Sequence, residues 1–211
     1  SSQTLLKKGL AIERMLDSLI INKSIKAQDL LIGDRNALII AARISGYGAN
    51  YKTQLACPSC GDRNGFDFDL TKQTIHESQE NEELGLSKLD NGNFTCTMPY
   101  SKFNIEFKLL NGKDEQYLSK LMSDKKKRKM SETTLTDQFK LMIVAIEGHT
   151  DRAIVSKYVD NMPTLDSTQL RACYKVAAPD IKVRDDFECN SCGFQQEMEV
   201  PFNTDFFWPN R

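Results

Sequence analysis

The strongest constraint on this chain is a pair of Cys-x-x-Cys motifs, Cys57-Pro58-Ser59-Cys60-Gly61 and Cys189-Asn190-Ser191-Cys192-Gly193. A tight turn at a hairpin tip lets both sulfurs of such a motif face one cation, and the glycine permits the unusual dihedral angles of the turn. Two such motifs supply four thiolates, which is the tetrahedral ligand set of structural zinc sites. We therefore predict that Cys57, Cys60, Cys189 and Cys192 bind one zinc ion.

The two motifs are far apart in the chain, with 128 residues between Cys60 and Cys189. Each nevertheless lies between two segments with the alternating pattern of β-strands, 51–56 and 66–70 around the first and 181–188 and 194–201 around the second. Closing so long a loop costs only a few kcal/mol, whereas zinc on four thiolates returns on the order of 10 kcal/mol. The pattern predicts a zinc ribbon built from sequence-distant hairpins.

Two other uses of these cysteines compete with a zinc site. An iron–sulfur cluster takes the same ligands and stays open as an alternative, whereas a thioredoxin-like redox pair requires a helix after the motif. Because all four ligands come from protein, the metal has no open position and is structural. Cys96 and Cys173 fall in a predicted strand and helix, where we expect buried thiols.

The fold class predicted for the whole chain is α+β. Residues 1–50 form a helical segment, with a helix over 34–45 capped by Asp34 and ended by Gly46 and Gly48. Residues 51–70 and 181–211 form the two halves of the ribbon and an aromatic tail. Residues 71–180 form an insertion, with a loop over 76–89, a hairpin over 94–99 and 102–110, and helices over 114–129, 136–147, 152–161 and 167–177.

Composition excludes several classes of function. Hydrophobic residues make up 40% of the 211, charged residues make up 27%, and the net charge is −1. This balance indicates a globular protein and gives no general attraction to a polyanion. No apolar run is long enough for a membrane span, and we expect a reducing compartment with no signal peptide. No motif for a nucleotide, a nucleophile or a catalytic metal occurs, so we expect neither an enzyme nor a small-molecule substrate.

The basic run Lys125-Lys126-Lys127-Arg128-Lys129 supports a rival function. It would make the chain a nucleic-acid-associated zinc-ribbon protein whose lysines contact phosphates. The competing interpretation is a solvated helix end, where cations also suit the helix dipole. Carboxylates around the cysteine motifs would repel a phosphate backbone and disfavour nucleic acid; they are Asp62, Asp67, Asp69, Asp185, Asp186 and Glu188.

The chain closes with the aromatic residues Phe202, Phe206, Phe207 and Trp208. Aromatic side chains of this kind pack over a protein's own core or anchor a partner. If the segment is extended, Phe207 points opposite to Phe206 and Trp208. We take Phe206, Phe207 and Trp208 as candidate partner-binding residues.

Several of these features together resemble one bacteriophage family. They are Asp34-Arg35 opening a helix, Arg43-Ile44-Ser45-Gly46-Tyr47-Gly48 ending it, Tyr51 leading to Cys57-Pro58-Ser59-Cys60, and the closing Phe206-Phe207-Trp208-Pro209. The chain from about residue 25 to 209 resembles the baseplate proteins of T4-like contractile-tailed phages, in particular a hub subunit. The resemblance implies a structural or assembly role in the tail baseplate of the virion, assembly in the host cytoplasm, other hub proteins as partners, and no reaction.

Overall fold

The computed structural model describes the backbone of residues 2–128, 134–201 and 206, and their side chains from residue 11 onward. Its helices are α1 (Ser2–Leu19), the 3-10 helix η1 (Ala27–Asp29), α2 (Ile32–Tyr47), α3 (Gly112–Lys127), α4 (Thr134–Met142), α5 (Arg152–Asp160) and α6 (Thr164–Ala177). Its strands are β1 (Asn50–Ala56), β2 (Arg63–Asp69), β3 (Gln73–His76), β4 (Ser87–Lys88), β5 (Phe94–Thr97), β6 (Asn104–Phe107), β7 (Ile143–Ile146), β8 (Asp180–Glu188) and β9 (Gln195–Glu199). All strand pairs are antiparallel, and the predicted α+β class is confirmed.

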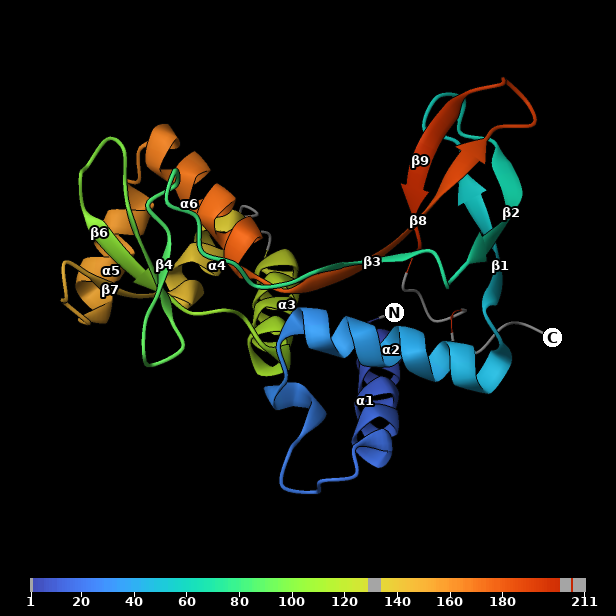
Figure 1. Ribbon diagram of the computed structural model, residues 1–211, viewed down its shortest axis with the longest axis horizontal. Coiled ribbons are helices and arrows are strands. Elements are labelled where there is room, and N and C mark those ends of the chain that lie inside the picture. The colour runs from blue at the N-terminus through green and yellow to red at the C-terminus, as the bar shows by residue number, and fades with distance from the viewer. Residues whose placement is uncertain (1, 129–133, 202–205, 207–211) are drawn as a thin grey trace.

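The strands form three sheets, β1-β2, β3-β8-β9 and β4-β5-β6-β7. Figure 1 shows two lobes joined by the long ribbon of β3 and β8, with α2 running beside that ribbon. One lobe holds β1, β2 and β9, and the other holds β4 to β7 with α4 to α6. Each lobe has its own cluster of buried apolar side chains. None of the described helices is long and apolar enough to cross a bilayer.

The hairpin β1-β2 follows from the period-two pattern of its sequence. Tyr51 and Leu55 are buried on β1, and Tyr51 pairs in register with the buried Phe68 of β2. Strand β8 contributes Val183 and Phe187 to the same core. The two hairpins therefore share one apolar layer beneath the cysteine motifs, although about 110 residues of chain separate them (β2 ends at residue 69 and β8 begins at residue 180).

Three secondary-structure predictions were wrong. The loop predicted over 76–89 contains β4, which pairs with β5. The helix predicted over 136–147 stops at Met142, and Ile143–Ile146 form β7, which pairs with β6. A short apolar run cannot be assigned to helix or strand by periodicity alone, and here pairing with β6 decides it. Asp34 does not cap α2, because the helix begins at Ile32 and its N-cap is Leu31, without a side-chain hydrogen bond. Gly48 ends the helix as predicted, with a φ of 86°, whereas Gly46 lies inside it.

Two close contacts hold α2 in place. Gly33 lies against the main chain of Pro179, and a Cβ at this position would come within 2.0 Å of the Pro179 carbonyl oxygen. Arg35 is buried and pairs with Glu13 of α1 and with Glu115 of α3, the latter at 2.6 Å. A buried guanidinium needs such partners, so the Arg35 pairs join three helices.

The second lobe depends on the fully buried carboxylate of Asp166, in the first turn of α6. It accepts hydrogen bonds from the main-chain N–H of Tyr100 at 2.8 Å and of Ser101 at 3.1 Å, and from the Tyr158 hydroxyl at 3.1 Å. Burial alone raises the pKa of Asp166, but the hydrogen bonds from Ser101 and Tyr100 outweigh it and hold the pKa below its ordinary value. Asp166 thus fixes the β5-β6 turn to α6.

We predict that Asp166→Asn lowers the free energy of unfolding by about 1–3 kcal/mol, because its amide places a donor against donors. The folded-state pKa of Asp166 is depressed, so its contribution is present at neutral pH and is lost as the pH falls below about 4. The difference between parent and variant should shrink in acid. Asp160→Asn, which removes an exposed ion pair with Lys140, is the control and should cost less than about 1 kcal/mol. Denaturant unfolding at several pH values measures both, and equal losses in the two variants would contradict the prediction.

Candidate metal centre

The two cysteine motifs fold into nearly identical turns. In the first, the Cys57 N–H donates to the Asp62 carbonyl at 2.8 Å and the Gly61 N–H donates to the Cys57 carbonyl at 2.9 Å. In the second, the corresponding bonds run from Cys189 to Phe194 and from Gly193 to Cys189, both at 2.9 Å. Gly61 and Gly193 adopt φ values of 78° and 68°, which side chains disfavour. The repeated motif therefore encodes a repeated turn.

The turns bring all four predicted sulfur ligands together. The Sγ atoms of Cys57, Cys60, Cys189 and Cys192 lie within 4.8 Å of one another. Cys57 and Cys192 are 3.7 Å apart, as are Cys60 and Cys189. A tetrahedron with metal–sulfur bonds of about 2.3 Å has edges of about 3.8 Å, whereas a disulfide bond is about 2.05 Å long. The spacing fits ligands around one cation, and all six cysteines are free thiols.

Main-chain N–H groups point at the sulfurs. The Ser59 N–H donates to the Cys57 Sγ at 3.4 Å. Burial raises the pKa of Cys189, but hydrogen bonds from the N–H groups of Cys192 and Ser191 outweigh burial and lower the pKa to about 6. For Cys60 a hydrogen bond from the Asp62 main chain lowers the pKa, yet partial desolvation and the neighbouring thiols raise it to about 12. Thiolates crowded in this way repel one another, so full deprotonation of the set requires a cation at its centre.

Asn64 on β2 connects the two motifs, and sequence reasoning missed it. Its amide donates to the Asp62 carbonyl at 3.1 Å and to the Cys189 Sγ at 3.4 Å. Its side-chain oxygen accepts from the Asn190 N–H at 2.9 Å. Asn64 is only 4% exposed. An asparagine at a strand start is common, and only the paired hairpins reveal that this one spans the two halves of the site.

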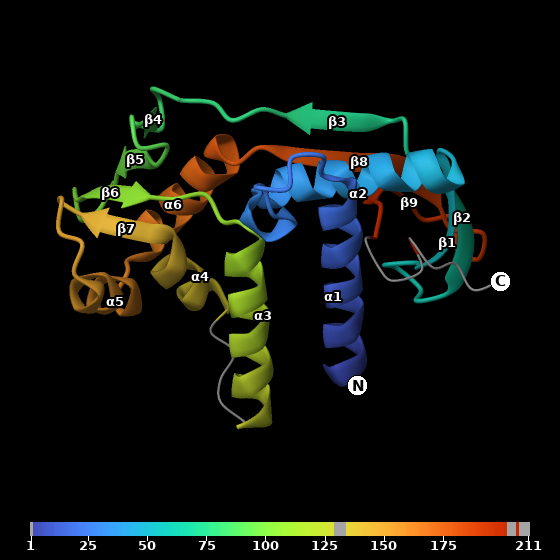
Figure 2. The ribbon, with the colours of Figure 1, turned by 90° about the horizontal axis from the view of Figure 1, so that it is seen from below.

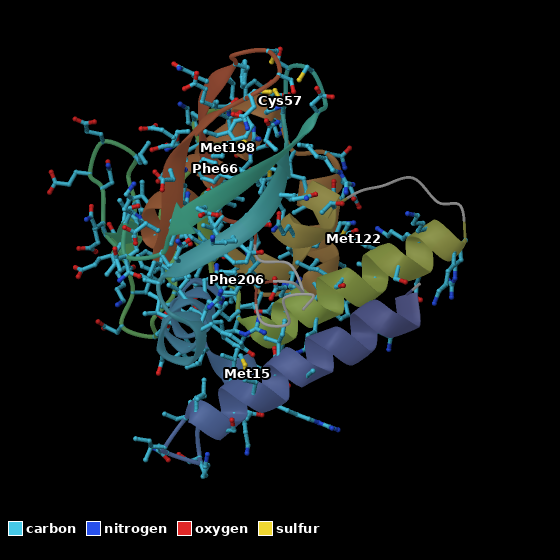
Figure 3. All side chains as sticks on the ribbon, turned by 90° about the vertical axis from the view of Figure 1, so that its right-hand side faces the viewer. Met15, Cys57, Phe66, Met122, Met198 and Phe206 are labelled. Atoms are coloured by element: carbon cyan, nitrogen blue, oxygen red, sulfur yellow. The ribbon has the colours of Figure 1, made fainter. Side chains whose placement is uncertain are left out.

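The site lies at the outer tip of the hairpins, where Figure 3 labels Cys57. Cys57 and Cys189 are buried, whereas Cys60 and Cys192 are exposed. A cation here would be held from the inner side by buried ligands and closed from the outside by exposed ones. Four protein ligands leave no position for a substrate. Cys96 and Cys173 are fully buried in the other lobe, as predicted.

Of the aromatic tail, Phe206 is described and is fully buried. Its ring packs edge-on against Tyr51, with centroids 4.8 Å apart, and lies 5.9 Å from the Arg43 guanidinium. In Figure 3 it lies at the opposite end of the hairpins from Cys57. Phe202, Phe207 and Trp208 lie outside the described residues.

The described residues of the basic run, 125–128, have different environments in the structure. Lys125 forms a largely buried ion pair with Asp137 of α4, at 2.6 Å. Lys127 pairs with the exposed Asp124 at 3.7 Å, and Lys129 lies outside the described residues. Lys125 therefore ties α4 to α3, which is a structural use that the sequence pattern did not reveal.

A closed site of four sulfurs is typical of proteins that use a metal to hold their fold and not to catalyse a reaction. The chain belongs to the family of T4 bacteriophage base plate proteins, whose match covers residues 4–208. This range includes α1, which the sequence resemblance did not cover. No curated protein and no solved structure matches the chain.

We predict that Asn64→Ala lowers the free energy of unfolding by about 1–3 kcal/mol, because it removes the buried amide that accepts from the Asn190 N–H and donates to the Cys189 Sγ. Asn190→Ala is the matched control, since its side chain is exposed and its removal should change stability by less than about 0.5 kcal/mol. Denaturant unfolding compares the two variants. If both variants lose equally little free energy of unfolding, Asn64 does not join the two halves of the site.

Proposed function

We propose that this protein is a structural or assembly component of the baseplate hub of a contractile-tailed phage, that it acts through contacts with other hub proteins, and that a structural zinc holds its ribbon together. The observation that carries the proposal is the family match across nearly the whole chain. The hub assignment is supported by the resemblance carried by α2, the first cysteine motif and the closing aromatics. The role involves no reaction.

The zinc assignment is supported by the four-sulfur set and its spacing. Zinc bound there would link residues 51–70 to residues 181–211, with the helical segment 1–50 beside them and residues 71–180 as an insertion. Zinc supplies no chemistry in this role beyond neutralising the four thiolates and fixing their positions. An iron–sulfur cluster is the alternative occupant, and metal analysis separates the two.

We predict that Cys60→Ser loses the metal and destabilises the chain far more than Cys96→Ser, because metal binding is coupled to folding. Cys96 is buried away from the site, so its variant should keep one zinc per chain. Thermal unfolding and elemental analysis of the two variants measure this. Zinc retained in both, with equal midpoints, would show that the metal does not hold the fold.

The tail is proposed to contribute to partner binding. Because Phe206 is buried against Tyr51, a truncation has to spare it. We predict that deleting residues 207–211 leaves a folded, metal-loaded chain that binds hub proteins less well, whereas Phe206→Ala lowers stability by about 3–5 kcal/mol. Pull-down of purified hub proteins, after circular dichroism, tests both variants. Undiminished capture by the truncated chain would remove the tail from the interface.

The assembly role itself is tested in phage-infected cells. A tagged chain should co-purify with baseplate proteins, and phage that lack the gene should accumulate incomplete baseplates. The nucleic-acid alternative predicts instead a salt-sensitive DNA affinity that vanishes when Lys126, Lys127 and Arg128 become glutamine. Complete baseplates without the protein would contradict the proposal.

A further inference from the structure

β3 is an edge strand, since its sheet has the order β3-β8-β9 and β3 pairs with β8 alone. Figure 2 shows it along the outer margin of the molecule, with β8 between it and α2. The strand lies midway between the two lobes, and three of its four residues are exposed.

The hydrogen-bond pattern of β8 shows which main-chain groups of β3 pair with β8 and which point away from it. The Val183 carbonyl accepts from the Val200 N–H at 3.0 Å, so the main-chain groups of Val183 point toward β9. Successive residues of an antiparallel strand bond to opposite sides. The main-chain groups of Lys182 and Asp180 therefore point toward β3.

The register pairs Lys182 with Thr74 and Asp180 with His76. The N–H and C=O groups of Thr74 and His76 are thus used within the sheet. Those of Gln73 and Ile75 point away from it, and no hydrogen bond within the described part of the chain engages them. The outer side of β3 is a row of open backbone donors and acceptors.

This edge lacks three of the features that protect natural sheet edges, which are charged residues, proline and a bulge. β9, the opposite edge, carries Glu197 and Glu199, which both pair with Arg184. β3 carries no Asp, Glu, Lys, Arg or proline. Ile75 is 69% exposed. An edge with open backbone groups, an exposed apolar residue and no acidic, lysine or arginine side chain is suited to receiving another strand.

A groove of about 250 Å³ lies beside β3, between it and the start of α2. Its size is below the range of about 300–1,000 Å³ for small-molecule pockets, and it suits a single side chain. Asp34, Glu77 and Asp180 line it. Asp180 pairs with Lys182 at 3.4 Å, whereas Asp34 and Glu77 have no ion pair within the described residues. The groove therefore favours a cationic occupant.

We propose that β3 docks an extended segment of another baseplate protein, which adds a strand to this edge and places a lysine or arginine side chain in the groove. Open backbone groups supply the main-chain hydrogen bonds, and alternate side chains of the added strand face α2. This inference rests on the proposed assembly role and names the surface that serves it.

The test titrates the full-length chain against each purified baseplate protein of the same phage. Ile75→Pro removes an N–H that the fold does not use, so the partner that binds the parent should bind this variant about tenfold or more weakly. Ile75→Thr keeps the N–H and β-branching and is the control, expected to stay within about threefold. The double variant Asp34→Asn with Glu77→Gln should also weaken binding and reduce its salt dependence.

Amide hydrogen exchange on the unmutated complex tests the same edge without relying on any variant. The Ile75 amide should exchange freely in the isolated chain and become protected in the complex, while Thr74 and His76 are protected in both. A partner that binds without protecting Ile75, or that binds Ile75→Pro as well as the parent, overturns the β3 inference and leaves the assembly role standing. A dimer of this chain that Ile75→Pro dissociates, with partner binding intact, overturns it too. If no baseplate protein binds the parent chain, the assembly role fails as well.

Discussion

The convergence of four sulfurs at the tip of two hairpins is the constraint on which the rest of this structure depends. It joins residues 57 and 192, and so fixes β1-β2 against β8-β9. The apolar layer beneath, with Tyr51, Phe68 and Phe187, can form only when both hairpins are present. β8 then continues out of this layer and carries β3 with it, and the second lobe is built from the chain between these two strands (Figure 1). A cation would fix the distance between the two hairpins at their tip, and the buried apolar side chains fix it along the rest of the strands.

Three of the residues that carry the family resemblance, Arg43, Tyr51 and Phe206, meet in space at the other end of the same hairpins. Arg43 of α2 places its guanidinium 4.8 Å from the Tyr47 ring and 5.7 Å from the Tyr51 ring. Phe206 closes the cluster by packing on Tyr51. A buried cation over aromatic faces is favourable, so one contact joins the end of α2, the start of β1 and the closing segment. Three residues that are separate in the sequence therefore form a single packing cluster.

Much of this arrangement could be predicted because it is encoded locally. The glycine after each cysteine pair, the alternating residues of β1 and β2, and Gly48 at the end of α2 each act within a few positions. What could not be predicted depends on distant partners. β3 is a strand because it pairs with β8, and Ile143–Ile146 form a strand because they pair with β6. Asn64 joins the two cysteine motifs only because the fold brings Asn190 next to it. Lys125 likewise resembled a solvated charge until Asp137 was placed against it.

We propose that one zinc ion, bound by four thiolates, closes the ribbon. X-ray absorption at the zinc edge of the purified full-length protein tests this most directly. We expect one zinc per chain and a first shell of four sulfurs at about 2.3 Å, with no nitrogen or oxygen ligand. A protein that carries iron at this site, or zinc with a mixed or incomplete sulfur shell, would contradict it.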